Sequence, residues 1–257
     1  MPKPTIAIFA PDSADIDKAT VVAKQLNLPY RELNQAYDFL LLVTSEYIGI
    51  QPCHAQITTK PLHVDFLSAK LQYRQHQASL RKEALARAIG MKPGNNPYIV
   101  DATAGLARDS FILASLGFEI TLLERSPILH LLVMDAIQRS ATDSMIATIT
   151  HRLHLVHTDA ITWLLEKKSS NQSPQIIYLD PMFPERRKTA EVKKEMRILQ
   201  DLLGEDNDAN QLLITALTCA TQRVVVKRPR LAPPLAGHTP AFQLVGKSAR
   251  FDIYITR

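Results

Sequence analysis

The sequence is poor in cysteine and has no long apolar run. Its 257 residues include two cysteines, Cys53 and Cys219, too few and too far apart for a metal knuckle or a disulfide framework. His151, His154 and His157 run into a predicted strand, so their side chains do not share one face, and we expect no metal site. No segment approaches the roughly 20 apolar residues that span a bilayer, and the apolar start is too short for a signal peptide. We therefore expect a cytoplasmic protein that does not enter a membrane.

Glycine is also scarce, with eight residues in the chain. The turn after the predicted strand 98–101 contains Gly105 as its one glycine, so the G-x-G-x-x-G pattern of a dinucleotide fold is absent. The other residues of the turn are small, which lets a ligand approach the backbone, and the N-terminus of the following helix favours an anionic group. This segment therefore predicts a strand, a turn and the start of a helix. The turn either binds a ligand or is simply a tight connection between the strand and the helix.

The composition is that of a globular protein with an excess of positive charge. Apolar residues make up 46% of the chain and charged residues 21%, which does not indicate disorder. The net charge of +5 is unevenly distributed, because residues 60–92 contain seven lysines and arginines against two acids. Further basic clusters lie at 186–197 and 227–230. Three clusters favour a phosphate-rich partner over merely solvated surfaces.

The first part of the chain, residues 1–95, reads as a small α/β domain. We expect strands at 5–10, 39–43 and 47–50 and a helix at 15–26. Residues 67–89 contain no glycine or proline and are predicted to form one long basic helix that ends at Gly90. The turn-rich segment 93–97 marks the boundary of this domain.

The second part, residues 96–257, alternates strands and helices. Strands are expected at 98–101, 119–124, 153–157, 175–180 and 223–227, with helices at 107–116, 127–139, 160–167, 190–203 and 209–221. Such alternation predicts an α/β fold with a doubly wound, mostly parallel sheet. Strands at 242–245 and 251–256 have no helix between them, so the sheet should end in an antiparallel hairpin.

Acids stand at the ends of four successive predicted strands: Asp101, Glu124, Asp159 and Asp180. Glu124 is placed to accept hydrogen bonds from ribose hydroxyls, as acids do in other doubly wound nucleotide sites. Asp159 either accepts from an adenine amine or caps the following helix, and the two roles are compatible. Together the four acids indicate the adenosyl pocket of a class I S-adenosylmethionine methyltransferase.

The strand that ends at Asp180 opens into the loop Asp180-Pro181-Met182-Phe183-Pro184. The loop offers a carboxylate, a carbonyl oxygen held by proline and an aromatic face, which suit a planar base with an exocyclic amine. In this hypothesis Asp180 and the Pro181 carbonyl accept the amine hydrogens while Phe183 stacks on the base, which must first leave its own stack. A proline-rich turn without a ligand is the alternative.

These motifs together resemble the ribosomal RNA small-subunit methyltransferase J family. The segments that carry the resemblance are 101–109 (DATAGLARD), 123–125 (LER), 178–184 (YLDPMFP), 192–197 (VKKEMR), 224–229 (VVVKRP) and 250–254 (RFDIY). The match covers roughly residues 60–257, while the first 55 residues match the family loosely. The resemblance implies a Rossmann-like class I methyltransferase fold. It also implies transfer of a methyl group from S-adenosyl-L-methionine to the N2 amine of a guanosine in 16S ribosomal RNA of the small subunit, with S-adenosyl-L-homocysteine as the product.

The resemblance also implies a set of cofactor contacts. They comprise Arg108, Asp109, Glu124, Arg125, Asp159, Ala160 and Asp180. The small-residue turn after the predicted strand 98–101 adds Asp101 and Gly105 as expected cofactor contacts. This chain departs from the family pattern at two places. Family members usually have glycine in place of Ala107, a mild steric change, and a glycine-rich stretch in place of residues 77–80, which suggests a more regular helix in this chain.

Two rival functions remain open at the level of sequence. An Asp-Pro-x-aromatic loop suits any planar amine, so the acceptor could instead be an adenine N6 amine in DNA or a glutamine amide in a protein. The chain could also be a non-catalytic RNA-binding or assembly factor that has kept the fold. Identifying the methylated molecule distinguishes the first rival from the expected function. Measuring the binding of S-adenosylmethionine distinguishes the second.

Overall fold

The computed structural model describes residues 4–32, 35–53, 60–90, 95, 97–181, 190–204, 207–247 and 249–256. Contacts divide the chain into two compact units. The N-terminal unit comprises Met1–Asp65, Leu131–Arg139 and Arg186–Glu205, and the main unit comprises Phe66–His130, Ser140–Glu185 and Asp206–Arg257. Within the described part of the chain, no helix has the length and apolar content needed to cross a membrane.

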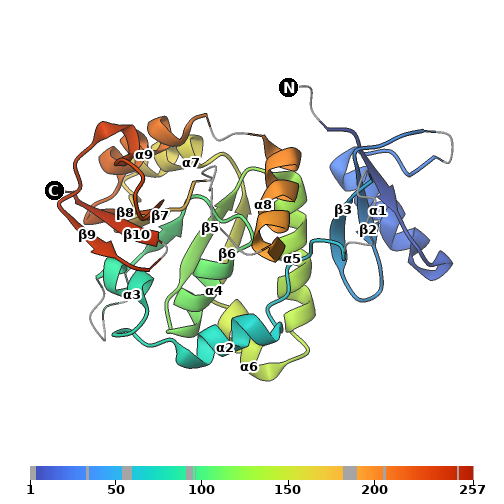
Figure 1. Cartoon of the computed structure of the whole chain (residues 1–257), viewed down its shortest axis with the longest axis horizontal. Helices are drawn as coiled ribbons and strands as arrows, with labels where there is room; N and C mark the ends of the chain where they lie inside the picture. The colour runs from blue at the N-terminus through green and yellow to red at the C-terminus, as the bar shows by residue number, and fades with distance from the viewer. Residues whose placement is uncertain are drawn as a thin grey trace. The chain divides into compact units, whose positions relative to one another are not determined.

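The main unit is built on a seven-stranded sheet (Figure 1). Its strands are β4 (Ile99–Asp101), β5 (Ile120–Glu124), β6 (Leu153–His157), β7 (Ile176–Leu179), β8 (Arg223–Pro229), β9 (Phe242–Val245) and β10 (Ala249–Ile255). They follow the order β6-β5-β4-β7-β8-β10-β9, in which the first five are parallel and β10 runs antiparallel to both of its neighbours. The predicted parallel sheet with a terminal antiparallel hairpin is therefore confirmed.

Helices cover both faces of this sheet, so the central strands β4 and β7 are buried along their whole length. The helices of the main unit are α2 (Ala69–Gln77), α3 (Ala84–Ile89), α4 (Arg108–Ser115), α6 (Ser144–Thr150), α7 (Ala160–Ser169) and α9 (Ala209–Cys219). Helices α7 and α9 pack together on one face (Figure 1), where alternate strand residues such as Val100, Ile177 and Val224 meet Leu164 and Leu213. The intervening residues of these strands point to the opposite face of the sheet, because successive side chains in a strand alternate between its two faces.

The predicted long helix at 67–89 is wrong, because two helices, α2 and α3, occupy this segment. The chain becomes extended at Ala78, which has φ −69° and ψ 138°. Ser79 then accepts the backbone N–H of Lys82 on its side chain and that of Glu83 on its carbonyl oxygen. This local capping competes with the helix although every residue is a tolerable helix former. The predicted end at Gly90 is confirmed, since Gly90 is left-handed with φ 72°.

One short helix, α6, was not anticipated by the sequence pattern. Its N-cap is Asp143, whose carboxylate accepts the backbone N–H groups of Met145 and Ile146. Seven residues are too few to show a convincing helical period, so the capping aspartate was the one available signal.

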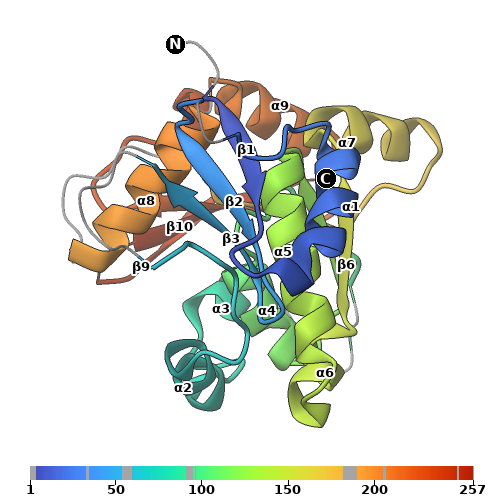
Figure 2. The same ribbon diagram turned by 90° about the vertical axis from the view of Figure 1, so that its right-hand side faces the viewer.

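The N-terminal unit contains a three-stranded sheet and helix α1 (Ile16–Leu26), seen together in Figure 2. Strand β2 (Phe39–Val43) lies between β1 (Ile6–Phe9), which is parallel to it, and β3 (Ile48–Pro52), which is antiparallel. Helix α8 (Ala190–Leu203) and the middle of α5 (Pro127–Ser140) belong to the same unit. The carboxylate of Asp135 on α5 accepts the Ile48 N–H at 3.1 Å and pairs with Arg139 at 2.7 Å.

The structure groups residues 66–90 with the main sheet, whereas the sequence places a domain boundary at residue 95. The reason is packing. Phe66 stacks on Phe111 of α4 at 4.9 Å, and Leu85 and Ile89 of α3 are fully buried. That residues 1–95 form a separate domain stays a prediction.

The start of α4 generates a prediction about stability. Its N-cap, Ala107, is left-handed with φ 55°, a conformation that costs a residue with a Cβ roughly 1–2 kcal/mol. Ala107 and Ala114 in the same helix are 1% and 0% exposed, so either Ala→Gly change removes a buried methyl group. Both changes should lower the free energy of unfolding, as measured by urea denaturation. We expect the loss in Ala107→Gly to be smaller than the loss in Ala114→Gly by about 1–2 kcal/mol. Equal losses would contradict strain at Ala107.

Candidate functional site

The four strand-end acids lie along one edge of the main sheet. Asp101 and Glu124 are the last residues of β4 and β5, while Asp159 and Asp180 follow β6 and β7. These four strands are parallel neighbours in the order β6-β5-β4-β7, so their carboxyl ends meet at the same edge. The structure thus brings together four residues that are up to 79 positions apart in the sequence.

Glu124 holds the turn between β4 and α4. Its carboxylate accepts the Gly105 N–H at 2.9 Å and the Ser126 N–H at 2.7 Å, and the residue is 7% exposed. Gly105 is left-handed with φ 55°, and the nearest neighbour of a Cβ there would be the Thr103 carbonyl oxygen at 3.8 Å. The backbone of the turn is therefore open to a ligand. Each carboxylate oxygen of Glu124 can accept more than one hydrogen bond, so it can hold the turn and ribose hydroxyls together.

Asp101 is buried inside the same turn, with 2% of its surface exposed. It accepts the Thr103 N–H at 3.1 Å and the Ser110 hydroxyl at 2.5 Å. Burial, with a smaller contribution from the negative charges of Asp109 and Asp180, raises the pKa of Asp101 to about 7, against the lowering effect of the two hydrogen bonds. Asp101 therefore acts first as a structural element of the turn, and its contact with a cofactor stays a prediction.

Four more of the predicted cofactor residues lie at helix starts or directly after a strand. Asp159 is the N-cap of α7, accepting the backbone N–H three residues ahead at 2.9 Å, so its predicted capping role is confirmed. Ala160 is the buried first residue of α7, and Arg108 is the exposed first residue of α4. Arg125 follows β5 and pairs with Asp208 at 2.6 Å on the surface. All four stand near the carboxyl edge of the sheet, and their contacts with a cofactor stay predictions.

Asp109 differs from these residues, because it is the centre of an ion network. One oxygen accepts Arg74 of α2 at 2.7 Å, and the other accepts the Tyr178 hydroxyl at 2.8 Å and the Lys227 ammonium at 2.7 Å. Lys227 also contacts the carboxylate of Asp180 at 2.8 Å. A residue predicted to touch the cofactor is thus engaged from three sides by protein groups and, through Lys227, is linked to the Asp-Pro loop.

The charges of this network stabilise one another. Burial by itself would raise the pKa of Asp109, but Lys227 and Arg74 outweigh burial and hold that pKa well below its usual range. Burial lowers the pKa of Lys227, yet Asp109 and Asp180 more than compensate and raise it, so Lys227 stays protonated. Burial raises the pKa of Tyr178 far above its ordinary value, helped by Asp109, and the phenol remains a hydrogen-bond donor.

Sequence reasoning missed Tyr178, Lys227 and Arg74 as members of the site. The register pairs Tyr178 with Val225 on β7 and β8, so Asp180 and Lys227, each two residues further on, extend toward the same face. That face is the one on the α4 side. The pairing of β7 with β8, which brings Lys227 beside Asp180, could not be read from the sequence.

The Asp-Pro loop is described as far as Pro181, which is buried. The Asp180 N–H donates to the Thr103 hydroxyl at 2.6 Å, which ties the start of the loop to the β4–α4 turn. Met182, Phe183 and Pro184 lie outside the described residues, so the predicted stacking role of Phe183 stays a prediction.

The basic clusters differ in how much of their charge faces solvent. Four cations of the first cluster are exposed in the main unit: Lys70, Arg81, Lys82 and Arg87. In the third cluster Lys227 belongs to the ion network and Arg228 is 6% exposed, so only Arg230 of the three faces solvent. Lys227 and Arg228 are neighbours on β8 that point to opposite faces of the sheet, and both are engaged within the protein, so this cluster has less charge to offer to phosphates than the sequence suggests. That the clusters bind phosphate stays a prediction.

The histidines at 151, 154 and 157 do not converge. His154 contacts Glu119 at 2.9 Å, while the His157 ring lies 5.1 Å from the His130 ring. Burial lowers the pKa of His130, and its neighbour His157 lowers it further. Within the described ranges no three His, Cys, Asp or Glu side chains gather as metal ligands. That the protein needs no metal stays a prediction.

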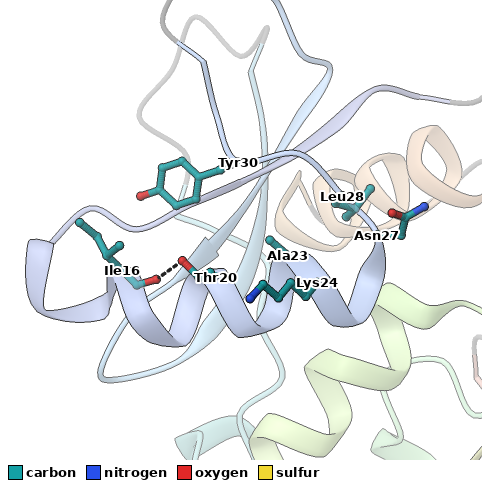
Figure 3. A pocket seen from close by; sticks show the side chains of 7 residues that line it. All are labelled: Ile16, Thr20, Ala23, Lys24, Asn27, Leu28 and Tyr30. Atoms are coloured by element: carbon teal, nitrogen blue, oxygen red, sulfur yellow. Dashed lines mark hydrogen bonds between the residues drawn. The ribbon is translucent and has the colours of Figure 1, made fainter.

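Two hollows lie in the N-terminal unit. One, of about 400 Å³, runs along α1 beside Ile16, Thr20, Lys24 and Tyr30, with the Thr20 hydroxyl donating to the Ile16 carbonyl at 2.9 Å (Figure 3). The other, of about 590 Å³, is lined by Phe9 and Arg31 among others. Neither includes a strand-end acid, so neither is the site described above.

Comparison with known proteins identifies the family. A family model described as putative SAM-dependent methyltransferase matches residues 21–256. Ribosomal RNA small subunit methyltransferase J from Thioalkalivibrio sulfidiphilus is 45% identical over 240 residues, covering 93% of each chain. Its counterpart from Coxiella burnetii is 40% identical over 254 residues, covering 98% of each. This chain belongs to the ribosomal RNA small subunit methyltransferase J family.

A solved structure agrees with this assignment. The SAM-dependent methyltransferase from Neisseria gonorrhoeae superposes with a TM-score of 0.75 and 33% identity, covering 98% of this chain and 95% of the other. The expected methyltransferase J family, the SAM-dependent methyltransferase activity and the class I fold are thereby confirmed. The similarity also extends into the first 55 residues, where the motifs had matched loosely.

The residues of this methyltransferase fit S-adenosylmethionine. The open backbone at Gly105 and the acceptor capacity of Glu124 suit a ribose and an amino-acid tail, which carry hydroxyl, ammonium and carboxylate groups. Asp159, after the neighbouring strand β6, is placed where an adenine amine would find an acceptor.

The buried Asp101 of the methyltransferase generates a prediction about pH. Its pKa of about 7 in the folded protein exceeds the roughly 3.9 of an unfolded aspartate, so the folded state retains a proton that the unfolded chain has lost. Stability from this group is present below about pH 4 and is lost as the pH rises to about 7. Across this window, the free energy of unfolding of Asp101→Asn should rise relative to that of the wild type by up to about 1.4 kcal/mol per pH unit. Urea denaturation without cofactor measures this difference. A stability difference that stays constant with pH would contradict the raised pKa.

Proposed function

We propose that this chain transfers a methyl group from S-adenosylmethionine to the N2 amine of a guanosine in 16S ribosomal RNA of the small subunit, in the cytoplasm. The ribosomal acceptor is supported by the names of the relatives, which match nearly the whole chain. The amine acceptor is supported by one observation in the structure. Asp180, next to Pro181 at the carboxyl edge of the sheet, has its carboxylate held by Lys227 at 2.8 Å beside the strand-end acids.

The cofactor, when bound, supplies a methyl group on a positively charged sulfur. Guanine N2 is a poor nucleophile, because its lone pair is delocalised into the ring. An ionised carboxylate accepts up to about four hydrogen bonds, so Asp180 can accept an amine hydrogen while it still contacts Lys227. The Pro181 carbonyl would accept the second hydrogen. These two acceptors orient the nitrogen lone pair and stabilise the positive charge that develops on the nitrogen.

Lys227 shapes this role of Asp180. Its ammonium favours the ionised carboxylate and fixes its position, because Lys227 is itself anchored by Asp109 at 2.7 Å. Asp180 is thereby prepared as a hydrogen-bond acceptor before the base arrives. The proton of the methylated amine can pass to Asp180 or to water.

Replacing Asp180 tests the mechanism. We expect Asp180→Ala to reduce kcat by about 10²–10³, the usual effect of losing one preorganised electrostatic contact. Affinity for S-adenosylmethionine should fall less than in Glu124→Ala, because Glu124 is the predicted ribose ligand. Turnover is measured with labelled cofactor and small subunits or 16S RNA, and affinity by calorimetry.

The fold should survive in Asp180→Ala, since Lys227 keeps its contact with Asp109, and thermal unfolding of the variant checks this. Undiminished turnover would rule out the mechanism. Methyl label found in DNA or protein rather than in ribosomal RNA would rule out the proposed acceptor, and absence of cofactor binding would rule out an enzyme.

The exposed cations generate a prediction about salt. If the protein binds RNA through phosphates, log affinity falls linearly with log salt concentration, because each contact releases condensed counterions. A protein that makes about 6–10 phosphate contacts loses roughly 10³–10⁵ in affinity between 50 and 200 mM salt. We expect a steep decline of this kind in a titration of 16S RNA by fluorescence anisotropy. A flat salt response would contradict phosphate binding.

A further inference from the structure

One face of helix α2 is polar, basic and aromatic at once. Lys70, Tyr73, His76 and Gln77 are exposed and are spaced three or four residues apart, so they share the outward face of the helix. Tyr73 is 70% exposed, more than any other large aromatic residue among those described. The opposite side of the helix is anchored by the buried Leu71.

The segment after α2 adds positive charge to this face. Arg81 and Lys82 are exposed in the connection to α3. The one acid between residues 66 and 90 is Glu83, and it is paired with Arg74 at 3.0 Å. The exposed charges on and just after α2 are therefore cations. We call Lys70, Tyr73, His76, Gln77, Arg81 and Lys82 the α2 surface.

The α2 surface is connected to the Asp-Pro loop by a short series of contacts. Arg74, next to Tyr73 in the sequence, contacts Asp109 at 2.7 Å, Asp109 contacts Lys227 at 2.7 Å, and Lys227 contacts Asp180 at 2.8 Å. Helix α2 packs against α4, on the opposite side of the sheet from α7 and α9. A strand of RNA that presents its base at Asp180 therefore has this surface within reach of its neighbouring nucleotides.

We propose that the α2 surface binds the single-stranded RNA next to the target guanosine, with Tyr73 stacking on an unpaired base and Lys70, Arg81 and Lys82 contacting phosphates. The inference rests on the proposed function, because it takes RNA as the acceptor. Proteins that bind single strands combine a cationic track with an aromatic platform, and this surface offers both. A membrane or a protein groove would call for several apolar side chains, and this surface contains one tyrosine ring among three cations, an imidazole and an amide.

Variants of Tyr73 test the stacking contact. We expect Tyr73→Ala to weaken binding of a labelled 16S RNA fragment about 5- to 100-fold, the usual effect of losing one base–aromatic stack. In turnover, KM for RNA should rise by a similar factor, while kcat at saturating RNA and the affinity for S-adenosylmethionine stay within about two-fold. Tyr73→Phe keeps the ring and should bind like the wild type. Leu165→Ala, at a residue 49% exposed on α7, is the control for loss of an exposed side chain.

The phosphate contacts are tested by the triple variant Lys70→Gln, Arg81→Gln, Lys82→Gln. The slope of log affinity against log salt should become shallower by about 2, at roughly 0.7 per contact for single strands. Unchanged RNA affinity in Tyr73→Ala, or an unchanged slope in the triple variant, would overturn the inference. Because binding is measured apart from turnover, this outcome is distinct from failure of the proposed function, in which wild-type protein leaves small-subunit RNA unmethylated.

Discussion

Lys227 joins two carboxylates that would otherwise repel each other. Its ammonium lies 2.7 Å from Asp109 and 2.8 Å from Asp180, and Arg74 supplies a second positive charge to Asp109. Two cations thus balance two acids in a partly buried site, where an unpaired charge would be costly. The first turn of α4, the end of β7 and helix α2 all depend on this arrangement, because each contributes one member.

The same balance explains why Asp101 behaves differently from its neighbours. Its hydrogen-bond partners are a hydroxyl and a backbone N–H, which are neutral, while two negative charges lie nearby. A buried acid in such surroundings retains its proton to higher pH. The strand-end acids look equivalent in the sequence but serve in two ways. Asp101 holds the turn from inside, whereas Asp180 is the proposed acceptor of a hydrogen from the substrate amine.

The turn between β4 and α4 shows how a small departure from the family pattern is accommodated. Ala107 adopts the left-handed conformation that glycine takes without cost, and Gly105 adopts it as well. The carboxylate of Glu124 and the side chain of Asp101 hold this turn from two sides. The family resemblance implies a mild steric change at Ala107, and the structure adds that this residue also holds a backbone conformation that favours glycine.

Much of the sheet could be predicted from the sequence, because β-branched runs, alternation and turn residues are local signals. Strands β2, β6 and β9 and helix α8 have the predicted bounds, and the acids were correctly placed at strand ends. The break at Ala78 was missed, because Ser79 overrides a helix-forming composition by capping the next turn. Helix α6 was missed because it is too short to show a period.

By itself the sequence determined the α/β class, the edge at which the chemistry lies and the motifs that mark the family. Only the tertiary structure decided that Lys227, Tyr178 and Arg74 meet at Asp109, and that part of a basic cluster faces inward. The physical reason is that these contacts join residues 35, 69 and 118 positions apart from Asp109. Such contacts depend on which strands pair and which helix covers them, and no local pattern carries that information.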